Sequence, residues 1–203
     1  ASLYINWDLW AIISMLGAIY CFDRKKLDLS AIALGLSIAT KFMPVFLLIP
    51  IALIFLRRNQ LRAALQYFVV SALTFAAINL PVYLTTPEGW LRFYQLNTSR
   101  GSDWGSLWYA MSSLGVNMPN IDYLVILLLL AGFSAIALYV LELRYVPSLA
   151  ALSFIVMATV MCVSKVYSPQ YVLWLTPLAV IALIDKRDLH VFWIWQGAEL
   201  IYH

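Results

Sequence analysis

The chain has 203 residues, of which 64% are hydrophobic and 11% are charged, and its mean hydropathy is +0.86. A soluble domain carries about 25% charged residues, so this composition excludes a water-soluble globular protein. It predicts an all-α fold, a polytopic bundle of transmembrane helices of about 20 residues each. The formal net charge is only +3, and no basic cluster indicates nucleic acid as a partner.

Apolar segments follow one another along the chain and are separated by short connections that hold most of the basic residues. Nine of the thirteen Lys and Arg residues lie in four connections, at residues 23–26, 57–62, 142–144 and 185–187. The positive-inside rule places these connections in the cytoplasm. The predicted protein is therefore a multi-pass protein of the cell inner or plasma membrane. The apolar segments are residues 9–22, 29–56, 65–84, 121–143, 146–163, 171–184 and 189–203.

The segment from Leu29 to Leu56 has basic connections on both sides, which a single span does not allow. In its middle, Lys41 is charged and Pro44 cannot continue the hydrogen bonds of a helix. The sequence therefore predicts two short helices that turn back at Lys41, as a re-entrant or short-helix hairpin.

The 85–120 connection is rich in aromatic residues, which is unusual for a loop in water. Thr86 is a predicted N-cap and Pro87 a first helical residue. We expect interfacial helices in 85–120 that lie in the headgroup region. Anchoring in an aromatic belt, with no part in the chemistry, is the alternative. The aromatic residues at one-face spacing are Trp90, Phe93 and Tyr94.

Ionisable side chains at membrane depth are costly and therefore are candidate functional residues. Asp8 lies at a predicted helix start, where two interpretations stay open: stabilisation of the helix N-terminus, or a place in a binding site for a metal or a hydroxyl. Lys41 lies at the helix break, where it is able to bind a phosphate together with freed backbone amides. Its alternative is a lysine that extends to the interface.

The connection from Ser164 to Tyr171 places hydroxyls, an amine, an amide and phenols between two apolar segments. An ordinary polar turn is the alternative to a binding site. Arg100 is a further candidate for phosphate binding, since a guanidinium binds phosphate through two hydrogen bonds, and binding of lipid headgroups competes with that role. The candidate substrate-binding residues of the connection are Lys165, Tyr167, Gln170 and Tyr171.

Several motifs, in this order and spacing, resemble glycosyltransferase family 87, integral membrane transferases of the GT-C superfamily that include mannosyltransferases. The likeness runs through nearly all of the chain. The residues that carry it are Asn6–Asp8, Gly35–Pro44, Arg100–Trp104, Ser164–Pro177 and Trp195–Tyr202.

The resemblance implies a GT-C-like bundle that takes a sugar from a polyprenyl-phosphate donor on the extracytoplasmic face, without a nucleotide. It also implies a catalytic aspartate in the first outer loop, which would precede Ala1. We therefore expect residues 1–203 to be one transmembrane domain, the C-terminal portion of a larger protein, in which Asp8 is not the general base. Some mannosyltransferase relatives have a His-His pair where this chain has Gln170 and Tyr171.

The implied reaction is inverting transfer of a hexose, with mannose as the first expectation, to a lipid or glycan acceptor. We expect Lys41 and Lys165 to converge on the carrier phosphate and stabilise its growing charge. The expected partners are the polyprenyl-phosphate sugar, the acceptor and membrane lipids. No cofactor is expected, and a divalent metal stays an open possibility.

Two other classes of protein compete with the transferase. Broken helices that carry charge also occur in transporters and flippases of lipid-linked sugars. That class predicts a column of cations from one face to the other, whereas a transferase gathers its polar groups on one face. A structural membrane subunit predicts that the Lys41 and Lys165 regions face lipid or a partner protein and share no cavity.

Overall fold

The computed structural model describes residues 7–116, 118–182 and 188–202. In this part of the chain 82% of the residues are helical and no strand occurs, so the all-α prediction is confirmed. The helices are α1 (Asp8–Asp23), α2 (Leu27–Thr40), α3 (Leu48–Arg57), α4 (Leu61–Thr85), α5 (Pro87–Ser99), α6 (Leu107–Ser113), α7 (Ile121–Glu142), α8 (Leu149–Val163), α9 (Val172–Ala182) and α10 (Leu189–Tyr202), with 3₁₀-helices η2 (Met43–Leu47) and η3 (Pro169–Tyr171).

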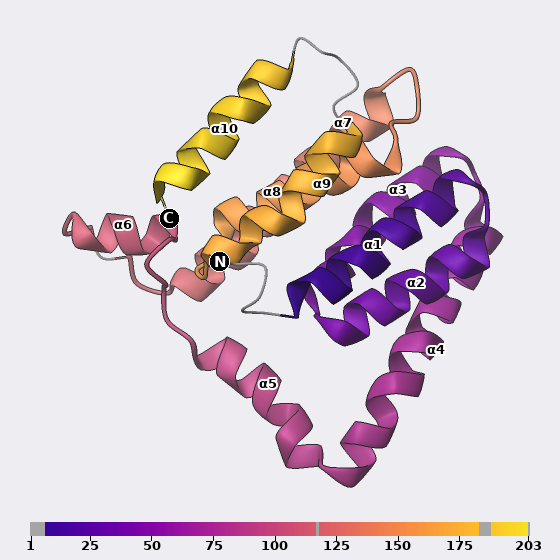
Figure 1. Cartoon of the computed structure of the whole chain (residues 1–203), viewed down its shortest axis with the longest axis horizontal. Helices are drawn as coiled ribbons and strands as arrows, with labels where there is room; N and C mark the ends of the chain where they lie inside the picture. Colours follow the sequence, from indigo (N-terminus) through magenta and orange to yellow (C-terminus); the bar gives the residue numbers. More distant parts are fainter. Residues whose placement is uncertain (1–6, 117, 183–187, 203) are drawn as a thin grey trace.

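Helices α1 and α2 pack side by side and run in opposite directions (Figure 1). Buried serines of α2 donate hydrogen bonds to backbone carbonyls of α1: the Ser37 hydroxyl to Ala11, at 2.6 Å, and the Ser30 hydroxyl to Ala18, at 2.7 Å. Ser37, near the end of α2, contacts Ala11 near the start of α1, and Ser30, near the start of α2, contacts Ala18 further along α1, so the two helices are antiparallel. These bonds satisfy the hydroxyls in an apolar core, where an unpaired one would be costly.

Helix α4 packs on the other side of α2 and runs parallel to it. The Ser71 hydroxyl donates to the Ala31 carbonyl at 3.1 Å, and Gln66 donates to Asp28 at 2.8 Å. Gly35 lets the two helices approach closely, because a Cβ atom there would lie 2.5 Å from the Ser71 carbonyl oxygen. Small residues at such contacts are typical of helix pairs in membranes.

The predicted helix break at Lys41 is present. Helix α2 ends at Thr40, Lys41 has an extended backbone, and the chain continues through η2 into α3. Lys41 pairs with Asp8 at the start of α1, whereas Phe55 of α3 contacts Phe22 at the other end of α1, with ring centroids 5.6 Å apart. The chain therefore turns back at Lys41, and α3 returns along the direction of α1.

Among the described residues, two helices are long and apolar enough to cross a membrane: α4 with 25 residues and α7 with 22. At 1.5 Å per residue they measure about 37 and 33 Å, which covers a hydrocarbon core of about 30 Å. Most of their apolar side chains are exposed on the outside of the bundle, as lipid-facing side chains are. The other apolar helices, α2, α3, α8 and α9, are shorter, so the polytopic arrangement stays a prediction for them.

Basic connections meet at one end of the bundle. Arg57, the last residue of α3, donates to the backbone carbonyls of Leu141, at 2.6 Å, and Leu143 where α7 ends. The guanidinium of Arg58 lies 5.9 Å from the centre of the Phe22 ring at the end of α1. We call this the basic end. Asp8 and Lys41 lie at the opposite end, and the connection at 185–187 lies outside the described residues.

Helices form in the 85–120 connection, as predicted, and α5 leads away from the end of α4 (Figure 1). Pro87 begins α5, but Thr86 does not cap it with its side chain: the hydroxyl donates to the Val82 carbonyl of α4, at 3.2 Å. The expected cap therefore belongs to the preceding helix, because α4 continues through Pro81 to Thr85 and leaves carbonyls that need donors.

Replacing Gly35 by alanine is expected to force α2 and α4 apart, because the new Cβ would meet Ser71 and Thr74 below 3 Å. We expect the free energy of unfolding to fall by about 1–3 kcal/mol, measured by denaturant titration in detergent. Gly17→Ala is the matched control, since a Cβ atom there meets nothing within 4 Å. Equal stability of the two variants would contradict the close contact.

Candidate functional site

Ion pairs gather at the end of the bundle opposite the basic end. They join Lys41 to Asp8, Lys165 to Asp122 and Arg100 to Asp103. Three of the residues predicted from the sequence, Lys41, Arg100 and Lys165, are the cations of these pairs, and a fourth, Asp8, is one of the carboxylates. We call this the site end.

The Asp8–Lys41 pair joins the start of α1 to the break after α2. The Asp8 side chain is 1% exposed, and its Oδ1 atom accepts a hydrogen bond from Lys41 Nζ. The other carboxylate oxygen, Oδ2, is buried and has no hydrogen-bond partner among the described residues. Lys41 is 27% exposed. Asp8 thus lies in the first turn of α1, where the helix dipole favours a negative charge, and it also contacts the predicted cation.

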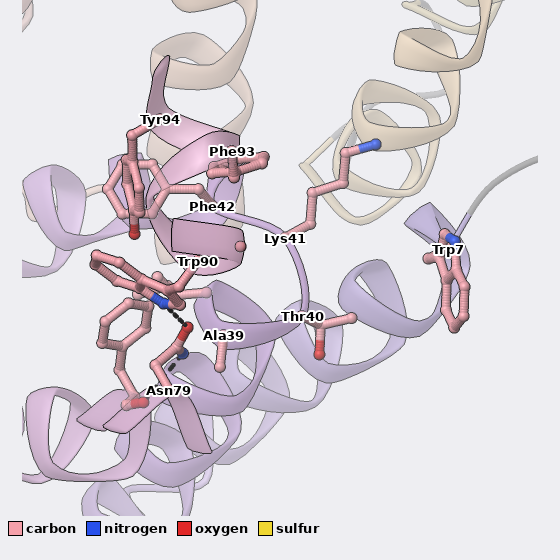
Figure 2. A pocket seen from close by; sticks show the side chains of 12 residues that line it. Trp7, Ala39, Thr40, Lys41, Phe42, Asn79, Trp90, Phe93 and Tyr94 are labelled. Carbon is pink, nitrogen blue, oxygen red and sulfur yellow. Dashed lines mark hydrogen bonds between the residues drawn. The ribbon is translucent and has the colours of Figure 1, made fainter. Parts of the chain in front are cut away.

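A cavity of about 390 Å³ lies beside Lys41, between the end of α2, α4 and α5. Figure 2 shows Trp90, Phe93 and Tyr94 of α5 grouped on one side of it, with the Lys41 ammonium directed away from these rings. The Trp90 indole N–H donates to the Asn79 side-chain oxygen at 2.9 Å. We call this the aromatic cavity; its lining suits an apolar or ring-shaped group more than a free ion.

A second cavity of about 320 Å³ has a polar lining, which includes Arg100, Lys165 and Asp122. Lys165 Nζ donates to Asp122 Oδ1 at 2.6 Å and approaches the Thr98 carbonyl at 3.5 Å. Arg100 donates to Asp103 at 2.7 Å. We call this the polar cavity. Two cations in one cavity are able to bind an anion such as a phosphate.

Hydrogen bonds hold the loop before α6 against the end of α8. The backbone N–H of Asp103 donates to the Lys165 carbonyl, and the Trp108 indole N–H donates to the Val163 carbonyl, each at 2.8 Å. Ser106 caps α6 by accepting from the Tyr109 N–H at 3.2 Å. These contacts fix the backbone around Arg100 and Lys165, and the sequence pattern did not indicate Trp108 or Asp103 as their anchors.

Tyr167 links the predicted polar connection to α10. Its ring lies 5.7 Å from that of Tyr171, and its hydroxyl donates to Glu199 Oε1 at 3.0 Å. The Trp195 indole donates to the same oxygen at 3.2 Å, whereas Glu199 Oε2 is buried without a partner among the described residues. Glu199 was not predicted as a site residue, although a carboxylate in an apolar helix is a signal for one.

The phenol of Tyr171 lies in the electrostatic field of several charges of the site end. Burial raises the pKa of Tyr171 most, and Arg100 lowers it, whereas the carboxylates of Asp8 and Asp103 raise it further. Tyr171 therefore interacts electrostatically with residues of both the Asp8–Lys41 pair and the Arg100–Asp103 pair. Because its pKa is raised, its phenol is neutral at physiological pH and able to form hydrogen bonds.

Lys41 and Lys165, expected to converge on one phosphate, are arranged differently in the structure. They line different cavities and have different carboxylate partners. Gln170 is half-buried beside Tyr171, whereas Asn6 of the predicted motif lies outside the described residues. Within residues 7–116, 118–182 and 188–202, no group of three or more His, Cys, Asp or Glu side chains is placed to hold a metal ion.

The fold and the charged site end define a helical membrane protein with its polar groups gathered beside apolar helices. The sequence model of glycosyltransferase family 87 matches residues 4–164, and the chain belongs to this family. It is therefore a membrane glycosyltransferase, as the resemblance implied. Searches among curated proteins and among solved structures found no match. Lys165, Tyr167, Gln170, Tyr171 and Glu199 lie beyond the matched residues.

The two lysine pairs are expected to differ in strength because they differ in burial. Removing one partner of a buried pair costs about 3–5 kcal/mol, and the partial exposure of Lys41 favours the lower part of that range. Exposed pairs contribute about 1 kcal/mol or less, and Asp122 is 65% exposed.

Double-mutant cycles test this difference. We expect a coupling of about 2 kcal/mol for Asp8→Asn with Lys41→Gln, and less than about 1 kcal/mol for Asp122→Asn with Lys165→Gln. The free energy of unfolding is measured by denaturant titration in detergent. Similar couplings in the two cycles would show that the Asp8–Lys41 pair is not the stronger one.

Proposed function

We propose that this glycosyltransferase moves a hexose, with mannose as the first candidate, from a polyprenyl-phosphate donor to a lipid or glycan acceptor. The proposed reaction takes place on the extracytoplasmic face of the inner or plasma membrane and inverts the anomeric carbon. The observation that supports it best is the polar cavity, in which Arg100 and Lys165 lie together at the end opposite the basic connections. The positive-inside rule assigns that end to the outer face.

In the proposed step the acceptor hydroxyl attacks the anomeric carbon while the bond from that carbon to the phosphate oxygen breaks. The electron pair of that bond goes to the leaving polyprenyl phosphate, which gains a second negative charge. Cations placed beforehand near that charge stabilise the transition state more than the substrate, which is what accelerates a reaction.

The proposal gives Lys165 and Arg100 the contact with the phosphate. Both have partly or largely exposed carboxylate partners, 65% for Asp122 and 29% for Asp103, so a phosphate displaces them at small cost. Lys41 is different, because a phosphate that took it from Asp8 would leave a buried carboxylate without its cation. We therefore propose that Lys41 holds Asp8 and borders the donor site without giving up its partner.

Hydroxyls of the sugar are proposed to contact the connection that carries Tyr167, Gln170 and Tyr171. The neutral phenol of Tyr171 lies near Arg100, and its hydroxyl is able to donate or accept a hydrogen bond there. The acceptor proton needs a general base, since a neutral hydroxyl is a weak nucleophile. We assign no proton transfer to Asp8, and propose that the base is the aspartate that the family resemblance places before Ala1.

A flippase of lipid-linked sugars is the second candidate, and the distribution of buried polar groups favours the transferase. In the described part of the chain the buried polar side chains are those of Asp8, at the site end, and of serines. Because none of these is a cation, the column of positive charge that transport predicts is not supported there.

A transfer assay on the full-length protein in proteoliposomes tests the function. Polyprenyl-phosphate sugars are supplied with and without an acceptor lipid. Acceptor-dependent release of polyprenyl phosphate is the expected result. Movement of intact donor across the bilayer, without cleavage of the bond to the sugar, would favour the flippase instead.

Lys165→Gln and Arg100→Gln are each expected to lower kcat/KM for the donor by about 10²-fold, because each removes a cation that stabilises the leaving phosphate. Lys165→Arg keeps the charge and is expected to lose less. Arg144→Gln is the control, since Arg144 is an exposed residue next to Leu143 at the basic end. Loss of activity in Arg144→Gln equal to that in the two site variants would contradict the assignment.

A further inference from the structure

A groove lined by basic residues lies at the basic end, between the connection from α1 to α2 and the connection from α3 to α4. One cavity, of about 360 Å³, has Lys25, Arg58 and Gln60 in its lining, together with Phe22 and Asp23. An adjoining cavity of about 440 Å³ is lined by residues 27 and 59–63, among them Gln60 again and Arg62. We call the two together the basic groove.

The two connections that form the groove have the same backbone motif. Two residues after the last residue of each helix, the backbone has positive φ, at Lys25 (58°) after α1 and at Asn59 (53°) after α3. The next N–H donates back five residues in each case, from Lys26 to Cys21 and from Gln60 to Phe55, both at 2.9 Å. This is the Schellman motif, in which glycine is the usual residue at positive φ. Lys25 thus places a cation where the backbone favours glycine, and residues held in such conformations are frequent at functional sites.

Helices α2 and α4 begin directly after these turns, and their first turns lie side by side because the helices are parallel. The hydrogen bond from Gln66 to Asp28 joins them there. Neither N-cap residue, Lys26 or Gln60, caps its helix with its side chain. The free amides at both helix starts and the positive dipole end of α4 add to the attraction of the groove for an anion, whereas the Asp28 carboxylate in the first turn of α2 already offsets the dipole of that helix.

The cations of the groove lack the carboxylate partners that Lys41, Arg100 and Lys165 have at the site end. In the described part of the chain, Lys25, Arg58 and Arg62 make no ion pair within 4.0 Å. Among the described residues that line the two cavities, Asp23 is the one acidic side chain, against three cations. The groove therefore has a surplus of positive charge that an anion is able to neutralise.

Apolar side chains border the groove where the outer surface of the bundle begins. Leu61, at the start of α4, lines the groove and is 63% exposed, and Leu65, one turn further, is 67% exposed. Leu56, the residue before the last of α3, is 51% exposed. A ligand that reaches both the cations and these leucines has a charged head and a hydrocarbon chain.

We propose that the basic groove binds the phosphate of an anionic phospholipid, with an acyl chain of that lipid along Leu61 and Leu65 of α4. Juxtamembrane basic clusters attract anionic lipids in general; the preformed groove with two uncapped helix starts makes this a specific site. The groove lies at the other end of α1 from Asp8, about 24 Å away for 16 residues, so the lipid is no substrate. It anchors the turns from which α2 and α4 run to the site end.

Native mass spectrometry of the detergent-solubilised full-length protein tests the proposal. The protein is titrated with phosphatidylglycerol, with phosphatidylcholine of the same acyl chains, and with inorganic phosphate. We expect saturable binding of phosphatidylglycerol at least 10-fold tighter than that of phosphatidylcholine and of phosphate. Equal affinity for the two lipids would overturn the proposal, and tighter binding of phosphate would replace the lipid by a free anion.

Variants locate the site. Lys25→Gly combined with Arg58→Gln is expected to weaken phosphatidylglycerol binding at least 10-fold. Glycine suits the positive φ of residue 25, so this variant is expected to fold.

Arg144→Gln removes one exposed charge at the same end but outside the groove. It is expected to change the affinity by no more than about 2-fold. If Arg144→Gln weakened binding as much as the double variant, the lipid would be attracted by the general surface charge, and the groove would not be a site.

Discussion

The buried carboxylate of Asp8 is the constraint on which the site end depends. An ionised group that is 1% exposed in an apolar bundle needs a cation, and Lys41 provides it from the break after α2. A continuous helix from Leu27 to Arg57 would carry Lys41 in mid-span and could not return α3 beside α1. The ion pair thus joins the start of α1 to the turn of the hairpin, and this turn forms one wall of the aromatic cavity.

The two ends of the bundle differ in whether their basic side chains are paired with carboxylates. At the site end, Lys41, Arg100 and Lys165 each have a carboxylate partner, so the proposed binding of an anion by one of them would require an exchange of partners. At the basic end, Arg57 donates hydrogen bonds to the carbonyls at the end of α7. The cations of the basic groove make no ion pair with a carboxylate in the described part of the chain. Among the described residues, Lys41, Arg100 and Lys165 are therefore neutralised by carboxylates, whereas Lys25, Arg58 and Arg62 of the basic groove have no carboxylate within 4.0 Å.

The sequence was sufficient for the helices and for the break at Lys41, because charge, proline and the positive-inside rule act locally. It predicted the polar residues of the site end as a group but not their pairing. Lys165 meets Asp122, 43 residues away, and Tyr167 meets Glu199, 32 residues away. Such contacts depend on how the helices pack against one another, and this packing cannot be predicted from the hydropathy of the sequence. Thr86 shows the same limit locally, since its hydroxyl bonds to α4 rather than to α5.

The polar cavity is assembled from three connections that are distant in sequence, those at residues 98–102, 118–122 and 165. Backbone and indole hydrogen bonds from Asp103 and Trp108 to the end of α8 hold two of them together, without using the side chains of Arg100 or Lys165. The scaffold of the cavity is therefore independent of its cations. Because the cations contribute little to this scaffold, the proposed phosphate binding would let them change partner without loss of the scaffold, whereas Lys41 is paired with a buried carboxylate and would leave it without a cation.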